Sequence, residues 1–225
     1  LGDKPLGKLT RADVERWQLS KLEEGKLSAR TINHALSALK VALSYAEDAR
    51  MIAESPAAKV SKLAERPQER GVLSPEEAKE VLKPERWKDR GLWLFNALAA
   101  VTGARMGELQ ALRVGAVHRD HLDIREAWQP RYGFKEPKWG SRRKVPIGPQ
   151  TYTALDEWIG TLEDKDQEAL VFPGSKPGRP VAPKTISRAL YAAMDRAGIK
   201  EKQRENRRLG FHSWRHFATT QLRKA

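Results

Sequence analysis

The hydrophobic pattern of this chain breaks once, at residues 59–71, and that break determines how the chain divides into domains. The segment reads KVSKLAERPQERG. It has no helical or strand period, many charges and a proline, which is typical of a linker. We therefore expect a helical domain at residues 1–62, a linker at residues 63–71 and a second domain at residues 72–225.

The first domain is predicted to be a small helical bundle. Thr10 followed by Asp13 has the pattern of a helix N-cap, and Gly25 ends that helix. A second helix begins at Ser28, where apolar residues recur every three or four positions and form one buried stripe. Beside the stripe runs a polar line made of Arg30, Asn33, Ser37 and Lys40. This line either faces a DNA groove or is an ordinary solvated helix face.

The second domain mixes helices with short strands. The sequence SPEE at residues 74–77 starts a helix, and the apolar run at 92–101 predicts a central buried helix. Alternating stretches at residues 121–128 and 143–147 predict strands of a small antiparallel sheet. Helical patterns return at residues 149–162 and 183–197. The predicted fold class is mainly α, with a small antiparallel β-sheet in the second domain.

The charge of the chain favours a polyanionic partner. The 225 residues carry a formal net charge of +13, and the sequence pI is about 10.0. Basic residues spread along the sequence suit a phosphate backbone better than a membrane surface, since no apolar run or amphipathic anchor accompanies them. The absence of cysteine excludes disulfides and thiol chemistry and fits a reducing compartment. Composition alone would also permit a ribosomal or other RNA-binding protein.

Three short segments carry residues suited to chemistry on phosphate. In TGARMGEL, at residues 102–109, Arg105 and Glu108 lie on one side of a helix. In HSWR, at residues 212–215, an imidazole and a guanidinium lie one helical turn apart. Lys138 lies between them, at the tip of the predicted strand pair. Taken singly, these are a surface ion pair, a weak motif and an exposed loop lysine.

Taken in this order, the three segments resemble the tyrosine recombinases, or phage integrase family. The match comprises A-R-x-G-E-L at residues 104–109, a lysine ahead of a basic residue and V-P at 138–146, and HSWRHFAT at 212–219. The pattern T-I-N-x-x-L-S-x-L-K at residues 31–40 also looks like the helical, SAM-like core-binding domain of that family. The resemblance implies that residues 72–225 form the catalytic domain.

The resemblance implies DNA strand cleavage and rejoining through a 3′-phosphotyrosine, with no metal, ATP or other cofactor. Arg105 and Arg215 would meet charge on the non-bridging oxygens, because guanidinium is planar and permanently charged. Lys138 would protonate the leaving 5′-oxygen, with Lys135 as the fallback. His212 would assist proton transfer and phosphate binding, and Glu108 would support the site.

The resemblance also implies partners and a location. Double-stranded DNA would lie between the polar line of the first domain and a second set of residues, Lys184, Thr185 and Arg188. The active assembly would be a tetramer on DNA, with no membrane and no small-molecule substrate. Site-specific recombination or integration of a mobile element would then take place on cytoplasmic, nucleoid-associated DNA of a prokaryote or phage.

One feature departs from the family pattern. The family's nucleophilic tyrosine follows H-x-x-R by some tens of residues, whereas this chain ends ten residues after Arg215. Its tyrosines, Tyr45, Tyr132, Tyr152 and Tyr191, all precede that segment. We expect a catalytic domain incomplete at its C-terminus, and a fragment inactive in cleavage. The alternatives are a catalytically dead DNA-binding relative, a type IB topoisomerase-like enzyme and a basic scaffolding protein without DNA affinity.

Overall fold

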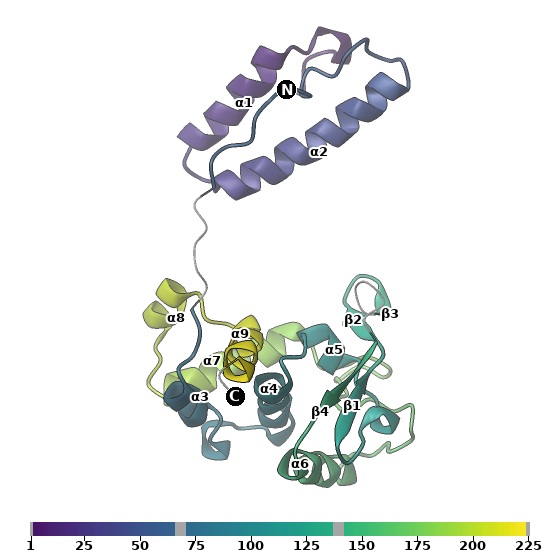
Figure 1. The fold of residues 1–225 in the computed structure, drawn as a ribbon, viewed down its shortest axis with the longest axis vertical. Helices are drawn as coiled ribbons and strands as arrows, with labels where there is room; N and C mark the ends of the chain where they lie inside the picture. The colour runs from purple at the N-terminus through teal and green to yellow at the C-terminus, as the bar shows by residue number, and fades with distance from the viewer. Residues whose placement is uncertain (1, 66–70, 137–141, 224–225) are drawn as a thin grey trace. The chain divides into compact units, whose positions relative to one another are not determined.

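The computed structural model describes residues 2–65, 71–136 and 142–223. The chain divides into two compact units, Leu1–Gln68 and Glu69–Ala225 (Figure 1). The structure is mostly helical with small antiparallel sheets, as the sequence predicts. Among the described residues, none of the helices is both long and apolar enough to cross a membrane.

The first unit is built on two helices, α1 (Arg11–Glu23) and α2 (Ala29–Asp48), preceded by the short 3₁₀ helix η1 (Leu6–Lys8). The predicted cap of α1 is present: the Asp13 amide donates to the Thr10 hydroxyl, and the Thr10 amide donates to the Asp13 carboxylate. The core residues Val14, Leu36, Leu43, Ala57 and Val60 are almost completely buried. The predicted apolar stripe of α2 therefore forms the centre of this unit.

The polar line predicted along α2 requires a correction at Asn33. Its side chain is buried, its amide group donates to the Leu63 carbonyl at 2.9 Å and to Glu65, and its carbonyl accepts from the Leu63 amide at 2.8 Å. Because these contacts use the amide within the protein, Asn33 does not face a DNA groove. The same contacts hold residues 63–65, predicted as linker, against the first unit.

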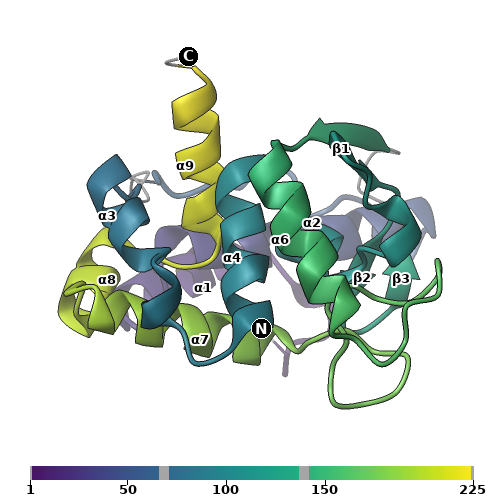
Figure 2. The same ribbon diagram turned by 90° about the horizontal axis from the view of Figure 1, so that it is seen from below.

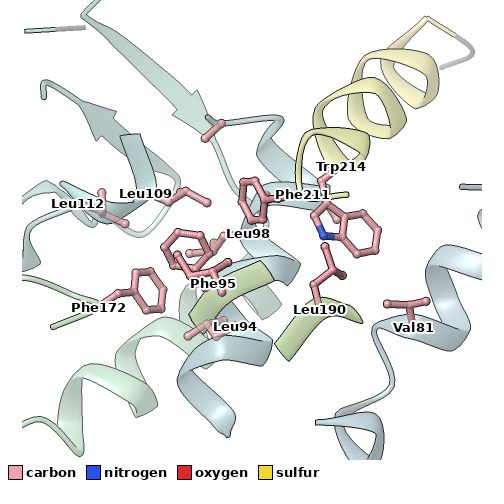
Figure 3. Close-up of a cluster of buried hydrophobic side chains, with 14 of the residues drawn as sticks. Val81, Leu94, Phe95, Leu98, Leu109, Leu112, Phe172, Leu190, Phe211 and Trp214 are labelled. Carbon is pink, nitrogen blue, oxygen red and sulfur yellow. The ribbon is translucent and has the colours of Figure 1, made fainter. Parts of the chain in front are cut away.

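The second unit surrounds one buried helix. Its helical elements are α3 (Pro75–Val81), η2 (Pro84–Arg86), α4 (Arg90–Thr102), α5 (Met106–Gln110), η3 (Val114–Ala116), α6 (Pro149–Gly160), α7 (Pro183–Arg196), α8 (Glu201–Arg207) and α9 (His212–Leu222). Figure 2 shows α4, the predicted central helix, among α6, α7 and α9, which all pack against it. Phe95 of α4 lies at the centre of the core, with Phe172 and Phe211 at ring distances of 5.0 and 5.5 Å (Figure 3).

The strands form two small sheets instead of the single sheet predicted. In one, β1 (His121–Ile124) pairs antiparallel with β4 (Arg143–Pro146); in the other, β2 (Ala127–Gln129) pairs with β3 (Gly133–Lys135). The predicted strand at 121–128 is therefore split. Leu122 and Ile124 face the core, whereas Trp128 packs on Phe134 of the hairpin, at a ring distance of 4.7 Å. The two halves bury their apolar faces against different partners, which a local alternation does not reveal.

An ion pair joins α8 to α3. Arg207 donates through two nitrogens to the two carboxylate oxygens of Glu77, at 2.6 and 2.8 Å. Arg207 also donates to the Val72 carbonyl, and its own carbonyl accepts from the Gly71 amide. The hydrogen bonds from Arg207 lower the pKa of Glu77, although partial burial opposes this. The pair thus fastens the start of the second unit to α8.

Replacing Glu77 by Gln is expected to lower the free energy of unfolding at neutral pH by about 1 kcal/mol, a partly screened value for a half-buried bidentate pair. A carboxyl with a lowered folded pKa stabilises the protein above its unfolded pKa and loses that contribution as the pH falls. The difference from the wild type should therefore shrink below pH 4.5, the ordinary value for this group. Urea unfolding at several pH values measures it. Glu205→Gln, on the exposed side of α8, is the control.

Candidate active site

Arg105 and Glu108 meet at the start of α5. The Arg105 amide donates to Glu108 Oε2 at 2.8 Å, which caps the helix, and Arg105 Nη1 donates to Oε1 at 2.9 Å. The Glu108 side chain is 1% exposed, whereas that of Arg105 is 44% exposed. The carboxylate therefore acts as a buried anchor, and the guanidinium keeps a face open to solvent. This is more than the surface ion pair that the local spacing alone suggests.

A third residue, Arg143 of β4, completes this group, and sequence reasoning missed it. Arg143 Nη1 and Nη2 donate to Glu108 Oε1 and Oε2 at 3.2 and 2.7 Å, a two-pronged contact across 35 positions of sequence. Burial disfavours the charged form of Glu108, but Arg143 and Arg105 outweigh it, so the pKa of Glu108 lies below its usual range. One buried carboxylate thus holds two guanidiniums. The only sequence signal was a basic residue ahead of V-P.

Gly107 lets α5 lie close to the hairpin formed by β2 and β3. A Cβ at this position would lie 2.6 Å from the backbone carbonyl oxygen of Trp128, closer than real Cβ atoms come. Only glycine lets the helix approach β2 at that distance. The glycine of the A-R-x-G-E-L motif therefore has a packing role beside the two charged residues.

Arg215 is brought to the same place from the C-terminal end of the described chain. Its Nη1 donates to the carbonyl oxygen of Gly103, the residue that ends α4, at 2.7 Å. Gly103 adopts a left-handed conformation, φ +63°, and a Cβ there would lie 3.2 Å from the Ala218 methyl. Burial and the neighbouring cations Arg105 and Arg143 lower the pKa of Arg215, while Glu108 opposes them. Arg215 therefore interacts electrostatically with Arg105, Glu108 and Arg143, and we call these four residues the arginine cluster.

The residue before Arg215 fixes α9 against α4. The Trp214 side chain is fully buried (Figure 3). Its Nε1 donates to Asn96 Oδ1 of α4 at 3.0 Å. Asn96 in turn donates to the Leu92 carbonyl at 2.8 Å, so its amide is oriented by its own helix. Because this polar pair lies inside an apolar core, it sets the rotation of α9 about its axis, and with it the direction of Arg215.

The remaining predicted catalytic residues are His212, Lys138 and the fallback Lys135. His212 is exposed at the first position of α9, one turn before Arg215, and its ring lies 5.0 Å from that of His216. Lys138 lies outside the described residues. Lys135, the fallback, ends β3, where its Nζ lies 4.4 Å from the centre of the Tyr132 ring.

The predicted DNA-contacting residues lie on two other helices. Lys184, Thr185 and Arg188 are exposed on α7. On α2, Arg30 is exposed, Ser37 donates to the carbonyl of Asn33, and Lys40 donates to that of Ala58. Within the described part of the second unit, we find no hydrogen bond or ion pair from Lys184, Thr185 or Arg188 to Arg105 or Arg215. The structure therefore groups the predicted catalytic residues Arg105, Glu108 and Arg215 with Arg143.

Comparison with known proteins identifies the family of this chain. The model of the phage integrase family matches residues 72–225, which include Arg105, Glu108, Arg143 and Arg215. The chain belongs to the phage integrase family. A search of curated proteins finds no significant match. The predicted relationship to the tyrosine recombinases is thereby confirmed.

Solved structures of tyrosine recombinases share the fold of this family member. Lambda integrase (residues 75–356), in a dimer bound to a COC′ core site, is 21% identical with a TM-score of 0.72, covering 98% of this chain and 76% of that one. The Tn1549 transposon integrase (residues 82–397), in complex with circular intermediate DNA, is 20% identical with a TM-score of 0.73, covering 100% and 76%. A lambda integrase tetramer bound to a Holliday junction also matches, at 21% identity and a TM-score of 0.72, covering 98% and 61%.

Proposed function

We propose that this integrase-family chain binds duplex DNA and carries the phosphate-binding side chains for site-specific strand exchange through a 3′-phosphotyrosine, whose tyrosine is none of the four in these 225 residues. The observation that carries the proposal is the charged cluster in which the buried Glu108 holds Arg105 and Arg143, next to Arg215. Arginine has five N–H donors, and the described structure occupies only part of the set on Arg105 and Arg215. The remaining donors are available for phosphate oxygens.

The chemistry follows from where charge develops. As a hydroxyl attacks the phosphorus, charge accumulates on the non-bridging oxygens, and fixed guanidiniums stabilise it without having to reorganise. Glu108 and Gly103 keep Arg105 and Arg215 in place before DNA arrives. His212 would assist proton transfer and phosphate binding from the same helix as Arg215.

Both units would contact the DNA. We assign residues 1–62 as a core-binding domain and residues 72–225 as the catalytic domain. Arg30, Ser37 and Lys40 would contact DNA from the first domain, and Lys184, Thr185 and Arg188 from the second. Lambda integrase forms a tetramer on a Holliday junction, and we extend that assembly to this chain when it acts on nucleoid DNA. Asn33 is not among the DNA contacts.

None of the four tyrosines is suited to be the nucleophile. Tyr45 is exposed on α2 in the first unit, and Tyr132 is exposed at the tip of the hairpin formed by β2 and β3. Tyr152 packs at the edge of the core, and the Tyr191 ring stacks with Arg204. Within the described part of the second unit, no hydrogen bond joins a tyrosine hydroxyl to Arg105 or Arg215. We propose that these 225 residues bind DNA without cleaving it.

Binding without cleavage is directly measurable. The 225-residue chain should retard a duplex carrying its core site, and the affinity should fall steeply with salt, since each neutralised phosphate adds about 0.9 to the log–log slope. A suicide substrate of the same sequence should give no covalent adduct. A slope below about 2 would contradict a two-domain contact with the backbone. An adduct would contradict the assignment of the tyrosines.

The proposed proton donor, Lys138, is tested with a sulfur leaving group in a form of the enzyme that cleaves DNA. Lys138→Ala should cleave an ordinary phosphodiester very slowly, because an alkoxide would leave unprotonated. A bridging 5′-phosphorothiolate leaves as a stable thiolate, so the variant should recover much of its rate. Arg105→Ala should not recover. Rescue of Lys135→Ala instead would transfer the role to Lys135.

A further inference from the structure

A second cluster of chemically active side chains shares no residue with the candidate active site. His118 follows η3, His121 begins β1, and Asp123 is two positions further along that strand. One ligand atom from each lies within 4.8 Å of the other two. The two imidazole rings stack, with centroids 4.4 Å apart and an interplanar angle of 21°.

The backbone holds these groups in place. The His118 amide donates to the His121 carbonyl at 2.9 Å, and Val117 forms an isolated antiparallel bridge with Leu122. This tight turn presents both imidazoles on the same side. The strand that follows is paired along its length with β4. The cluster is therefore built on a rigid element, as a binding site requires.

The Nε2 atom of His121 has no hydrogen-bond partner among the described residues and lies opposite a carboxylate oxygen of Asp123. The Nδ1 atom of the same ring lies 2.7 Å from Asp120 Oδ1, so the ring donates its proton there and leaves a lone pair on Nε2. Nε2 is buried and has no hydrogen-bond partner among the residues that the structure describes. The nearest carboxylate oxygen is Asp123 Oδ1, at 3.6 Å. Two lone pairs that face each other at this distance are stabilised by a cation between them.

The distances suit a tetrahedral metal ion. His118 Nε2 lies 3.3 Å from Asp123 Oδ2, to which it is hydrogen-bonded, and His121 Nε2 lies 3.6 Å from Oδ1, the other oxygen of that carboxylate. A metal ion would replace this hydrogen bond and release its proton. Two ligands, each about 2.1 Å from a zinc ion at tetrahedral angles, are roughly 3.4 Å apart. We propose that His118, His121 and Asp123 bind a divalent transition metal of the zinc class, with water as the fourth ligand. Asp120 orients His121 from behind, as carboxylates commonly do at zinc sites.

Cations on the protein compete for the same carboxylate. Arg125 Nη2 donates to Asp123 Oδ2 at 2.5 Å, and Lys144 is the register partner of Asp123 on β4. The Arg125 side chain is 58% exposed, so it turns into solvent when a metal ion takes its place. The ion would fasten the turn at residues 118–121 to β1. Since β1 pairs with β4, which carries Arg143, the ion would also stiffen the strand that supports Glu108.

Metal titration of the 225-residue chain tests this site. After treatment with a chelator, the chain should bind one Co²⁺ with the visible absorption of a tetrahedral complex, and Zn²⁺ should displace it. His118→Gln and His121→Gln should abolish that absorption. Asp120→Asn keeps every direct ligand and should weaken Zn²⁺ binding roughly 10- to 100-fold in calorimetry. Circular dichroism verifies that each variant is folded.

Two other histidines provide matched controls. His34→Gln, on the exposed side of α2, and His216→Gln, whose ring lies next to that of His212, should leave Co²⁺ absorption and Zn²⁺ affinity unchanged. Loss of binding in His216→Gln, with binding retained in folded His118→Gln and His121→Gln, would overturn the proposal. So would the absence of tetrahedral Co²⁺ absorption in the wild type. These readouts do not involve DNA, so they are independent of the proposed recombination.

Discussion

Glu108→Ala is expected to destabilise the second unit by about 3–5 kcal/mol, the usual cost of removing one partner from a buried ion pair. The variant leaves Arg105 and Arg143 side by side without the carboxylate that both contact. It also removes the acceptor of the Arg105 amide at the start of α5. Urea unfolding measures the loss, and hydrogen exchange of the α5 and β4 amides locates it.

Glu168→Ala is the matched control for this experiment. Its carboxylate also pairs with an arginine, Arg113, at 3.5 Å, but the side chain is 81% exposed. The control should change stability by no more than about 0.5 kcal/mol. If Glu108→Ala were equally mild, the carboxylate would not be the anchor of the arginine cluster. The destabilisation by Glu108→Gln should lie between those of Glu108→Ala and Glu168→Ala. The amide keeps one acceptor oxygen but turns an N–H₂ group toward a guanidinium.

Trp214→Ala should lower the free energy of unfolding by about 3–5 kcal/mol, because it leaves a cavity where a large buried aromatic side chain was. The indole is fully buried among Leu190, Phe211 and their neighbours (Figure 3). Its loss also frees Asn96 Oδ1 from its donor inside the core. Chemical unfolding and the hydrogen exchange of α9 measure the effect. The matched control is Tyr132→Ala, an aromatic truncation at an exposed hairpin position, which should be nearly neutral.

Trp214→Phe separates packing from hydrogen bonding. Phenylalanine retains most of the apolar contact but leaves Asn96 Oδ1 buried without its donor, at a cost of about 1–3 kcal/mol. Trp214→Phe should lower the free energy of unfolding less in an Asn96→Leu background than in the wild type, because the buried acceptor Asn96 Oδ1 is then absent. Equal costs in the two backgrounds would show that the Trp214–Asn96 contact does not orient α9.

The local features of the fold could be predicted from the sequence because they depend on neighbouring residues. The cap of α1 at Thr10, the start of α3 at Ser74 and the apolar run that became α4 all satisfy rules that act within a few positions. The grouping of Arg105 with Arg215 came from the resemblance to a family. No spacing rule connects two residues 110 positions apart.

What the sequence did not reveal depends on contacts between distant segments. Asn33 has the same local pattern as an exposed polar residue, but its amide is needed to satisfy the backbone of Leu63. Arg143 reads as one basic residue among several until β4 is paired and its guanidinium reaches Glu108. The split of the predicted strand has the same origin, since β2 gains its partner only when the chain folds back at Gly133.

The buried carboxylate of Glu108 has a consequence for enzyme kinetics. Its pKa is already lowered by two guanidiniums, and arginine side chains do not lose their protons in the working range of an enzyme. In the proposed function, the positive charge that these arginines offer to a phosphate would therefore not titrate between mildly acidic and mildly alkaline solution. A pH–rate profile of DNA cleavage would then report groups other than these arginines, among them His212, to which we assign both proton transfer and phosphate binding.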